Sequence, residues 1–198
     1  MARMRSEDRR RQLLEVSAEL FAESGYRGTT TAELARAARV TEPILYRHFE
    51  NKLHLFVTLV EEIGREVIRA WRQALDGVDD PARRLATLLA GNPSTHERGR
   101  NAYRVIFQAM TETPRDSEIA KALRRHLDEL HDFLEKELSA LQAAGAVRDD
   151  EPASILAWML MNVAIGYGMS TPLGVGGHTE SNGRKSMQKL LKDLLQPA

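Results

Sequence analysis

The segment VTEPILYRHFENK, from Val40 to Lys52, carries side chains suited to holding a polyanion such as DNA. Tyr46 and His48 can donate hydrogen bonds to phosphate oxygens, and Arg47 can neutralise one phosphate charge. Contacts of this kind fix position and affinity on a duplex but carry no sequence information. The chemistry requires a helix that presents these side chains at the edge of a DNA groove.

The start of the same segment supplies groups that can contact base edges. Glu42 can accept a hydrogen bond from a cytosine amino group, and Ile44 can meet a thymine methyl group. Thr41 is a suitable N-cap, and Pro43 then falls in the first helical turn, where its missing N–H costs nothing. We therefore predict a short helix that begins at Thr41 and ends near Phe49.

A second short helix is predicted just before this one. The run Thr30-Thr31-Ala32-Glu33 has the capping-box pattern, which starts a helix that ends near Ala38. A tight turn at Arg39-Val40 follows. Two short helices joined in this way form a helix-turn-helix, whose second helix lies in the major groove.

Helix N-termini provide further phosphate contacts in this region. Thr30 and Thr31 open one helix, Thr41 opens the next, and Asn51 and Lys52 open a third. Each such terminus offers free backbone N–H groups and the positive end of a helix dipole. Phosphate binding therefore does not require the recognition segment itself to be strongly basic.

The stretch AELFAESGYRGTTTAELARAARVTEPILYRHFENKLHLF, residues 18–56, resembles the DNA-binding domain of the tetracycline-repressor (TetR) family. The resemblance implies that Tyr46 and Lys52 contact the DNA backbone and that the start of the third helix contacts base edges. Two departures concern the turn and the helix start. Arg39 replaces a glycine common in the turn, so the turn is altered or Arg39 is strained. Glu42-Pro43 replaces a lysine or small residue, which leaves the base preference open.

The rest of the chain shows helical periodicity and no alternating strand pattern, so an all-α fold is predicted. The predicted helices cover residues 9–24, 30–38, 41–49, 51–75, 81–91, 100–112, 116–144, 151–170 and 183–195. Residues 1–52 are expected to form the helix-turn-helix DNA-binding domain, with its motif at about 31–50. Residues 53–198 are expected to form a helical effector-binding and dimerisation domain, joined to the first by the long fourth helix.

Composition narrows the function classes. The chain of 198 residues has no cysteine, which excludes disulfides, thiolate metal sites and cysteine nucleophiles and fits a cytoplasmic location. Its net charge is zero, but residues 1–52 hold ten basic and eight acidic residues, so the excess positive charge lies in the predicted DNA-binding part. The apolar stretch from Ile155 to Met169 is too short and too interrupted to span a bilayer, so no membrane partner is expected.

The last two predicted helices are candidates for a homodimer interface. The helix at 151–170 is apolar almost all round, and the helix at 183–195 has a regular apolar stripe formed by Met187, Leu190, Leu191, Leu194 and Leu195. By the family resemblance, both helices pair with their two-fold copies. The alternative is that the stripe packs within its own domain. A dimer would place two recognition helices about one DNA turn apart on a palindromic operator.

A small-molecule pocket is predicted from aromatic and thioether groups accompanied by polar ones. The predicted lining residues are Trp71, Tyr103, Phe107, Met110, Trp158 and Asn162. The alternative is that these residues belong to the core, with Asn162 bonded to a neighbour or across the dimer. A bound effector would shift the spacing of the DNA-binding heads, with the fourth helix as the lever.

An enzyme is the main alternative class. His126 and His131 are five residues apart, unlike the four-residue spacing of zinc-binding histidines on one helical face. Asp128 and His131 lack the further Glu-x-x-His pairs of a di-iron bundle. These residues are therefore assigned to solvated faces, and no enzyme activity, cofactor or metal is expected.

The sequence as a whole predicts a sequence-specific DNA-binding transcriptional regulator. We expect a homodimeric repressor that a small hydrophobic ligand releases from a palindromic operator. A ligand-insensitive DNA-binding regulator or an architectural protein is the alternative. An all-helical enzyme ranks below both.

Overall fold

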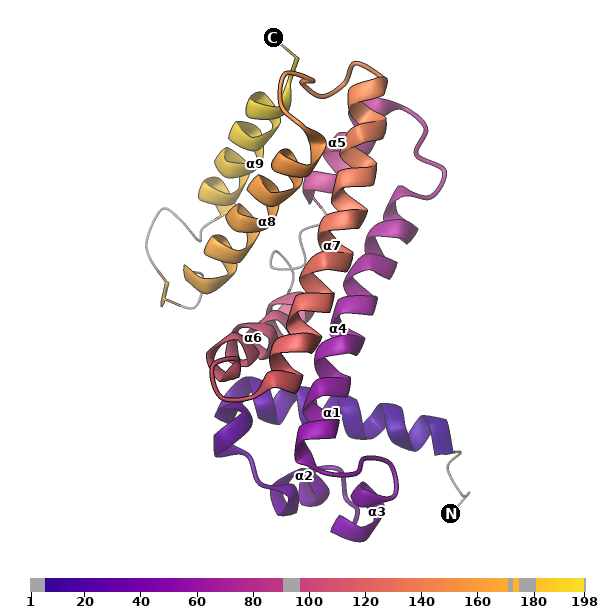
Figure 1. Ribbon diagram of the computed structural model, residues 1–198, viewed down its shortest axis with the longest axis vertical. Coiled ribbons are helices and arrows are strands. Elements are labelled where there is room, and N and C mark those ends of the chain that lie inside the picture. Colours follow the sequence, from indigo (N-terminus) through magenta and orange to yellow (C-terminus); the bar gives the residue numbers. More distant parts are fainter. Residues whose placement is uncertain (1–5, 91–96, 171–172, 175–180, 198) are drawn as a thin grey trace. The chain divides into compact units, whose positions relative to one another are not determined.

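The computed structural model describes residues 6–90, 97–170, 173–174 and 181–197, and these residues form helices without any strand. The all-α prediction is confirmed (Figure 1). The helices are α1 Ser6–Gly28, α2 Thr31–Ala37, α3 Glu42–Tyr46, α4 Lys52–Leu75, α5 Pro81–Ala90, α6 Glu97–Glu112, α7 Ser117–Ala143, α8 Ala153–Ser170 and α9 Ser181–Leu195. Each lies near its predicted range, although α3 ends earlier than predicted.

The chain forms two compact units, each assembled from separate stretches of sequence. Unit 1 comprises residues 1–64 and 101–126, and unit 2 comprises residues 65–100 and 127–198. Helices α4, α6 and α7 each continue from one unit into the other. The functional division at residue 52 remains a prediction, because it concerns roles rather than compactness.

The core of unit 1 contains an aromatic cluster from α1 and α4. The Phe21 ring meets the Phe56 ring edge to face at 5.0 Å, and the Tyr26 ring lies 4.8 Å from Phe56. Gly25, with φ of 75°, interrupts α1 as the predicted end of the first helix requires. The break turns Tyr26 back toward the cluster, and α2 packs against both α1 and α3.

Helices α6 and α7 complete unit 1. Arg27 of α1 forms an ion pair with Glu112 of α6, at 2.9 Å. Gln108 of α6 donates a hydrogen bond to the Ala22 carbonyl at 3.2 Å. These contacts fasten α6 to the far end of α1, so the helices around the helix-turn-helix come from distant parts of the sequence.

Unit 2 is organised around Trp71 and Arg84. The Trp71 ring stacks on Phe133 at 5.8 Å, and its Nε1–H donates to the Leu88 carbonyl at 3.2 Å. Arg84 forms a bidentate ion pair with Glu137, at 2.8 and 3.1 Å. Its guanidinium also donates to the carbonyls of Leu75, at the end of α4, and of Val78, so one side chain ties α4, α5 and α7 together.

Helix α8 has an unusual composition for a soluble domain. By length and mean hydropathy it could cross a membrane, contrary to the expectation that this stretch is too short, and it is the one such helix within the described ranges. Buried core helices of soluble proteins pass the same test. Leu156, Ala157, Leu160 and Met161 of α8 are buried within unit 2, whereas 33% of the helix as a whole is buried.

Candidate nucleic-acid interface and effector residues

The N-terminus of α2 is closed by a complete capping box. Thr30 Oγ1 accepts from the Glu33 backbone N–H at 3.2 Å, and the Thr30 N–H donates to Glu33 Oε2 at 2.8 Å. The predicted capping box is therefore confirmed. Thr30 hydrogen bonds hold the pKa of Glu33 below its ordinary value. The Thr30 hydroxyl also donates to Glu33, so this hydroxyl proton is already used within the protein.

A hydrogen bond links the starts of the two helices of the motif. Thr31 Oγ1 donates to Glu42 Oε2 at 2.7 Å. The bond fixes the Glu42 carboxylate at the start of α3 and consumes the only hydroxyl proton of Thr31. Any phosphate contact of Thr31 would therefore rely on its backbone N–H rather than its hydroxyl, whereas both the backbone N–H and the hydroxyl of Thr30 already donate to Glu33.

The turn between α2 and α3 has the geometry that normally selects glycine. Arg39 has a φ of 54°, the left-handed region. The Val40 N–H donates to the Ala35 carbonyl at 2.9 Å and the Arg39 N–H to the Arg36 carbonyl at 3.0 Å, which is the Schellman pattern. The turn is thus unaltered, and Arg39 bears the backbone cost that the sequence had suggested as one of two outcomes.

Helix α3 is short, with 5 residues. Thr41 occupies the N-cap position with extended backbone, but its side chain makes no capping hydrogen bond, unlike the prediction. Pro43 lies in the first turn as predicted, and Leu45 is buried against the core. The exposed Pro43 and the half-buried Ile44 leave the helix start accessible.

Tyr46, Arg47 and His48 lie at and just beyond the end of α3. Tyr46 and Arg47 are exposed, and His48 is half-buried. Burial, followed by the nearby positive charges of Arg10 and Arg47, lowers the pKa of His48. The side chain is therefore mostly neutral near pH 7 and can act as a hydrogen-bond donor to phosphate.

The first described residues of the arginine-rich N-terminus belong to α1. Arg10 stacks over the Phe49 ring at 4.5 Å and donates to the His48 carbonyl at 3.3 Å. It thereby holds the end of the recognition segment against α1. The preceding residues Arg3 and Arg5, which the sequence offers for phosphate or minor-groove contacts, lie outside the described residues.

Lys52 has internal partners. Its Nζ donates to the Tyr26 carbonyl at 2.9 Å and the Thr29 carbonyl at 3.0 Å, and lies 4.5 Å from the centre of the Tyr26 ring. Asn51 Oδ1 accepts from the His54 N–H at 2.8 Å and so caps α4. Both residues, expected at phosphates, have clear structural roles, and a DNA contact by Lys52 remains a prediction.

The six predicted effector residues are divided between the two units. Tyr103, Phe107 and Met110 belong to unit 1, with Tyr103 buried and the other two half-buried. Trp71, Trp158 and Asn162 belong to unit 2, where Trp71 is buried. Trp158 and Asn162 are exposed on α8, and their roles as effector residues remain predictions.

Unit 2 also carries a groove between α4 and α7 whose lining residues are mostly charged. It has a volume of about 730 Å³. The lining residues are Arg65, Ile68, Arg69, Arg72, Glu129, Asp132, Phe133, Lys136 and Glu137. None of the six predicted effector residues is among them, and the charged walls do not suit the hydrophobic ligand that the sequence suggested.

Two family models together cover most of the chain. Residues 13–59 match the model described as bacterial regulatory proteins, tetR family. Residues 81–196, more than half of the chain, match the model described as BetI-type transcriptional repressor, C-terminal. The chain belongs to the TetR family of transcriptional regulators. The resemblance stated from residues 18–56 is thereby confirmed.

Curated relatives of this TetR-family chain include both a transcriptional activator and a transcriptional repressor. The transcriptional activator FasR of Mycolicibacterium smegmatis is 29% identical over 143 residues, which are 71% of this chain and 65% of that protein. The transcriptional repressor KstR2 of Mycobacterium tuberculosis is 32% identical over 100 residues, 50% of each. The chain thus spans half to two thirds of the length of these relatives.

Solved structures share the fold of this TetR-family chain. A putative transcriptional regulator from Saccharomonospora viridis, in complex with choline, gives a TM-score of 0.81 at 21% identity and 95% coverage of both chains. A putative TetR-family regulator from Rhodococcus sp. gives 0.80 at 19% identity, over 96% of this chain and 100% of that one. Identities this low bear on the fold alone.

Sequence reasoning on this TetR-family chain misplaced His126. The residue was assigned to a solvated face, but it is 3% exposed. A usable signal was present, because the neighbouring Leu123 and Leu130 place position 126 on the apolar stripe of α7. Comparing His126 with His131 as a metal pair obscured that stripe.

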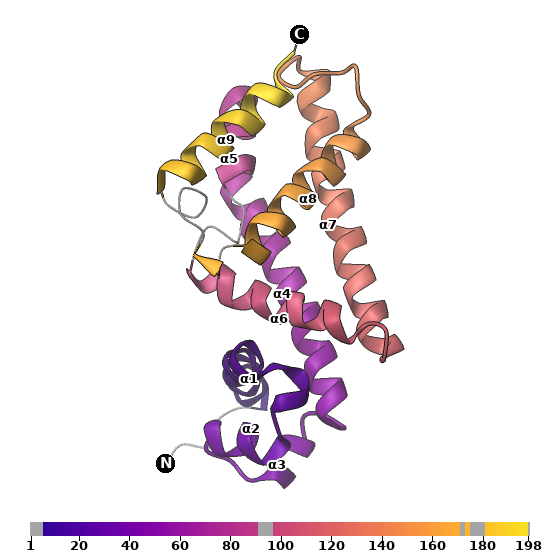
Figure 2. The same ribbon diagram turned by 90° about the vertical axis from the view of Figure 1, so that its left-hand side faces the viewer.

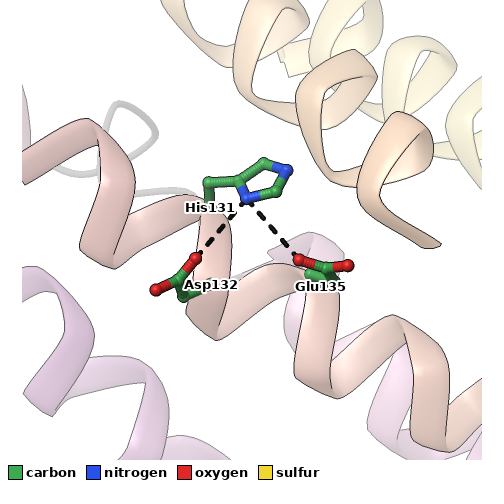
Figure 3. Close-up of side chains that lie close together, drawn as sticks. All are labelled: His131, Asp132 and Glu135. Carbon is green, nitrogen blue, oxygen red and sulfur yellow. Dashed lines mark ion pairs between the residues drawn. The ribbon is translucent and has the colours of Figure 1, made fainter.

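His131 lies instead beside two carboxylates on α7 (Figure 3). Its Nδ1 is 3.7 Å from both Asp132 Oδ1 and Glu135 Oε2, and its Nε2 is 3.1 Å from the Ser154 carbonyl. The potential ligand atoms of these three residues lie within 4.8 Å of one another. Both carboxylates are open to water, which solvates them, so the grouping alone does not indicate a metal ion.

Replacing Arg39 in the turn is expected to stabilise the TetR-family fold. Arg39→Gly removes a left-handed non-glycine residue and should raise the free energy of unfolding by about 0.5–1 kcal/mol, after the entropy cost of glycine is subtracted. Urea unfolding measures the change. Arg39→Ala removes the guanidinium but keeps the strain, so a similar gain with alanine would contradict the backbone explanation.

Proposed function

We propose that the protein is a homodimeric DNA-binding repressor that a small molecule releases from a palindromic operator. The observation that carries the proposal is the helix-turn-helix of α2 and α3, with its Schellman turn and the accessible start of α3. Repression rather than activation is favoured by the match of residues 81–196 to the BetI-type repressor model.

A dimer is supported by apolar side chains that unit 2 leaves uncovered. Ile155 of α8 is 55% exposed and Trp158 39%, while Leu190 and Leu194 of α9 are 57% and 53% exposed. Figures 1 and 2 show α8 and α9 on the same side of unit 2. Uncovered large apolar groups on two neighbouring helices are typical of an oligomer interface. The predicted four-helix pairing would cover them.

Effector sensing is supported by the fold of a neighbour. The regulator from Saccharomonospora viridis, which has this fold, was solved with choline. A fold that encloses a small molecule in one protein is a reasonable scaffold for a different ligand in another. We infer that this chain also binds a small-molecule effector.

Selection of bound duplexes from a random DNA pool tests the proposed function. The expected result is an enriched palindrome whose half-sites lie about one helical turn apart, centre to centre. Gel-shift titrations on that palindrome then give the affinity and its dependence on salt. Enrichment of no sequence, or of a single half-site, would contradict a dimeric sequence-specific regulator.

Disrupting the proposed dimer should weaken operator binding. Leu194→Glu places a charge on the uncovered face of α9, and sedimentation should show monomers at micromolar concentration. Loss of the second binding head should reduce operator affinity by about 10²–10⁴-fold. Lys189→Glu introduces the same charge at another exposed position of α9 and should leave the dimer intact. Equal behaviour of the two variants would refute the interface.

Glu42 is expected to contribute to base preference. Glu42→Ala should relax discrimination at one position of each half-site by about 1–3 kcal/mol, since a carboxylate can accept from a cytosine amino group. Thr31→Val keeps the carboxylate but removes the hydrogen bond that orients it, and should produce a smaller effect at the same position. Repeating the selection with each variant measures both. Unchanged preference in Glu42→Ala would exclude a base contact.

A further inference from the structure

His126 is a buried side chain whose hydrogen-bonding groups are not satisfied. It lies on α7 within unit 1 and is 3% exposed. Among the side chains that the structure describes, neither Nδ1 nor Nε2 has a hydrogen-bond partner. Buried polar atoms are nearly always paired, because leaving a donor without an acceptor costs free energy. The position can therefore take a partner from outside the described residues.

The Nδ1 edge of the ring is closed by Gly64 of α4. A Cβ built on Gly64 would lie 2.5 Å from Nδ1, but 3.2 and 3.4 Å from Cγ and Cε1, the two ring carbons bonded to it. These distances describe an approach to the Nδ1 edge rather than to the ring face. The Gly64 hydrogen that occupies this direction thus points at Nδ1.

This contact selects one tautomer of His126. A C–H group facing Nδ1 is compatible with a lone pair on that nitrogen. If Nδ1 carried a proton instead, that proton and the Gly64 hydrogen would point at each other. The neutral ring therefore carries its proton on Nε2. The unsatisfied group is then a buried N–H donor, and the missing partner is an acceptor.

The surroundings of the ring are apolar and aromatic. The Tyr103 ring of α6 lies 6.2 Å away, inclined by 67°, and Leu123 on the preceding turn of α7 is buried. Burial alone lowers the pKa of His126 to about 4, with no charged group among the causes. Burial also raises the pKa of Tyr103. Both rings are neutral near pH 7, so nothing here compensates a cationic ligand.

We propose that His126 is a polar contact for the effector, donating a hydrogen bond from Nε2–H to a carbonyl or carboxylate oxygen on an otherwise apolar small molecule. The proposal deepens the effector sensing proposed above and rests on it. Gly64 is a positioning residue, because it holds the ring edge that fixes the tautomer. Tyr103 borders the same ring and is the one predicted effector residue that this assignment retains as a direct neighbour.

The tautomer is tested first, on the full-length protein without additives. Long-range proton–nitrogen NMR spectra of ¹⁵N-histidine protein at pH 7 distinguish the two neutral forms of each ring. The His126 signals are identified by their loss in His126→Leu. Protonation at Nε2 is the expected result, and protonation at Nδ1 would overturn the proposal.

Binding is tested with three probes of similar size in a thermal-shift assay. Acetophenone carries a neutral carbonyl, benzoate carries a carboxylate, and ethylbenzene has neither oxygen. At least one oxygen-bearing probe should raise the Tm of the wild type more than ethylbenzene does, and the better of the two identifies the class. Failure of both to exceed ethylbenzene would overturn the proposal.

Two variants assign the effect to the Nε2–H donor. His126→Leu should weaken binding of the oxygen-bearing probe about tenfold and leave binding of ethylbenzene unchanged. His126→Gln places an amide N–H near the former Nε2 position and should restore most of the affinity. An oxygen effect that survives in His126→Leu would show that another group binds the probe. Loss in both variants would show that a donor at this position is insufficient.

Operator binding separates this proposal from the proposed function. The unliganded Leu and Gln variants should both bind the selected palindrome as the wild type does. A protein that binds its operator and releases it with undiminished sensitivity in His126→Leu retains the proposed function and refutes the role of His126. A protein that selects no operator refutes the proposed function, while the NMR and thermal-shift results still decide the His126 contact.

Discussion

Acidification from pH 6.5 to about 4 is expected to lower the free energy of unfolding by about 3 kcal/mol through protonation of His126 alone. The folded-state pKa of about 4 lies below the ordinary value of 6.5 because the ring is buried. Between these values the unfolded chain binds a proton at this position and the folded chain does not. Stability therefore falls as the pH drops through that window, and the contribution is constant above it.

Urea unfolding at several pH values measures this effect against a matched variant. His126→Leu cannot take up the proton, so its stability should decline less steeply between pH 6.5 and 4 than that of the wild type. Both proteins share the protonation of their carboxylates, which cancels in the difference. Parallel stability curves for the two proteins would show that His126 is not held neutral by the fold.

Lys52→Met is expected to destabilise unit 1 by about 2 kcal/mol. The substitution removes two charge-assisted hydrogen bonds, to the Tyr26 and Thr29 carbonyls, and the contact with the Tyr26 ring. Methionine keeps much of the aliphatic volume, so the loss reports the ammonium group. Thermal and urea unfolding of the full-length protein measure the change, and a loss below 0.5 kcal/mol would contradict the structural role.

The same variant bears on the DNA contact that the family resemblance implies for Lys52. Two carbonyls and an aromatic ring already surround its ammonium group, so the salt dependence of operator binding should remain nearly constant in Lys52→Met. Arg47→Gln is the comparison, because Arg47 is exposed at the end of α3. Loss of the Arg47 charge should reduce the magnitude of the slope of log affinity against log salt concentration by about 1. A similar decrease for Lys52→Met would assign Lys52 a phosphate contact.

Local signals in the sequence predicted the helices well. The capping box at Thr30, the break at Gly25 and the proline in the first turn of α3 act within a few residues, so they can be read directly. Even the positive φ of Arg39 was anticipated as one of two outcomes. Helix α3 ends early because Arg47 and His48 form a turn. No residue type at these two positions requires a helix to end there.

The parts that could not be predicted depend on contacts between distant residues. Lys52 meets carbonyls at positions 26 and 29, and Thr31 meets Glu42, so side chains expected at DNA find partners within the protein. Helix α8 is apolar almost all round, so its sequence gives no indication of which face is covered. The exposure of Trp158 and Asn162 therefore could not be predicted from the sequence.

The discontinuous make-up of unit 1 has a consequence for its synthesis on the ribosome. The recognition helices belong to residues 1–64, but the same unit also needs residues 101–126, including the partners of Arg27 and Ala22. The ribosome adds roughly 5–20 residues per second, so translation reaches residue 126 about 3–12 s after residue 64. During that interval the nascent DNA-binding segment lacks all or part of the stretch from residue 101 to residue 126, so unit 1 is completed only after residues 65–100 of unit 2 have been made.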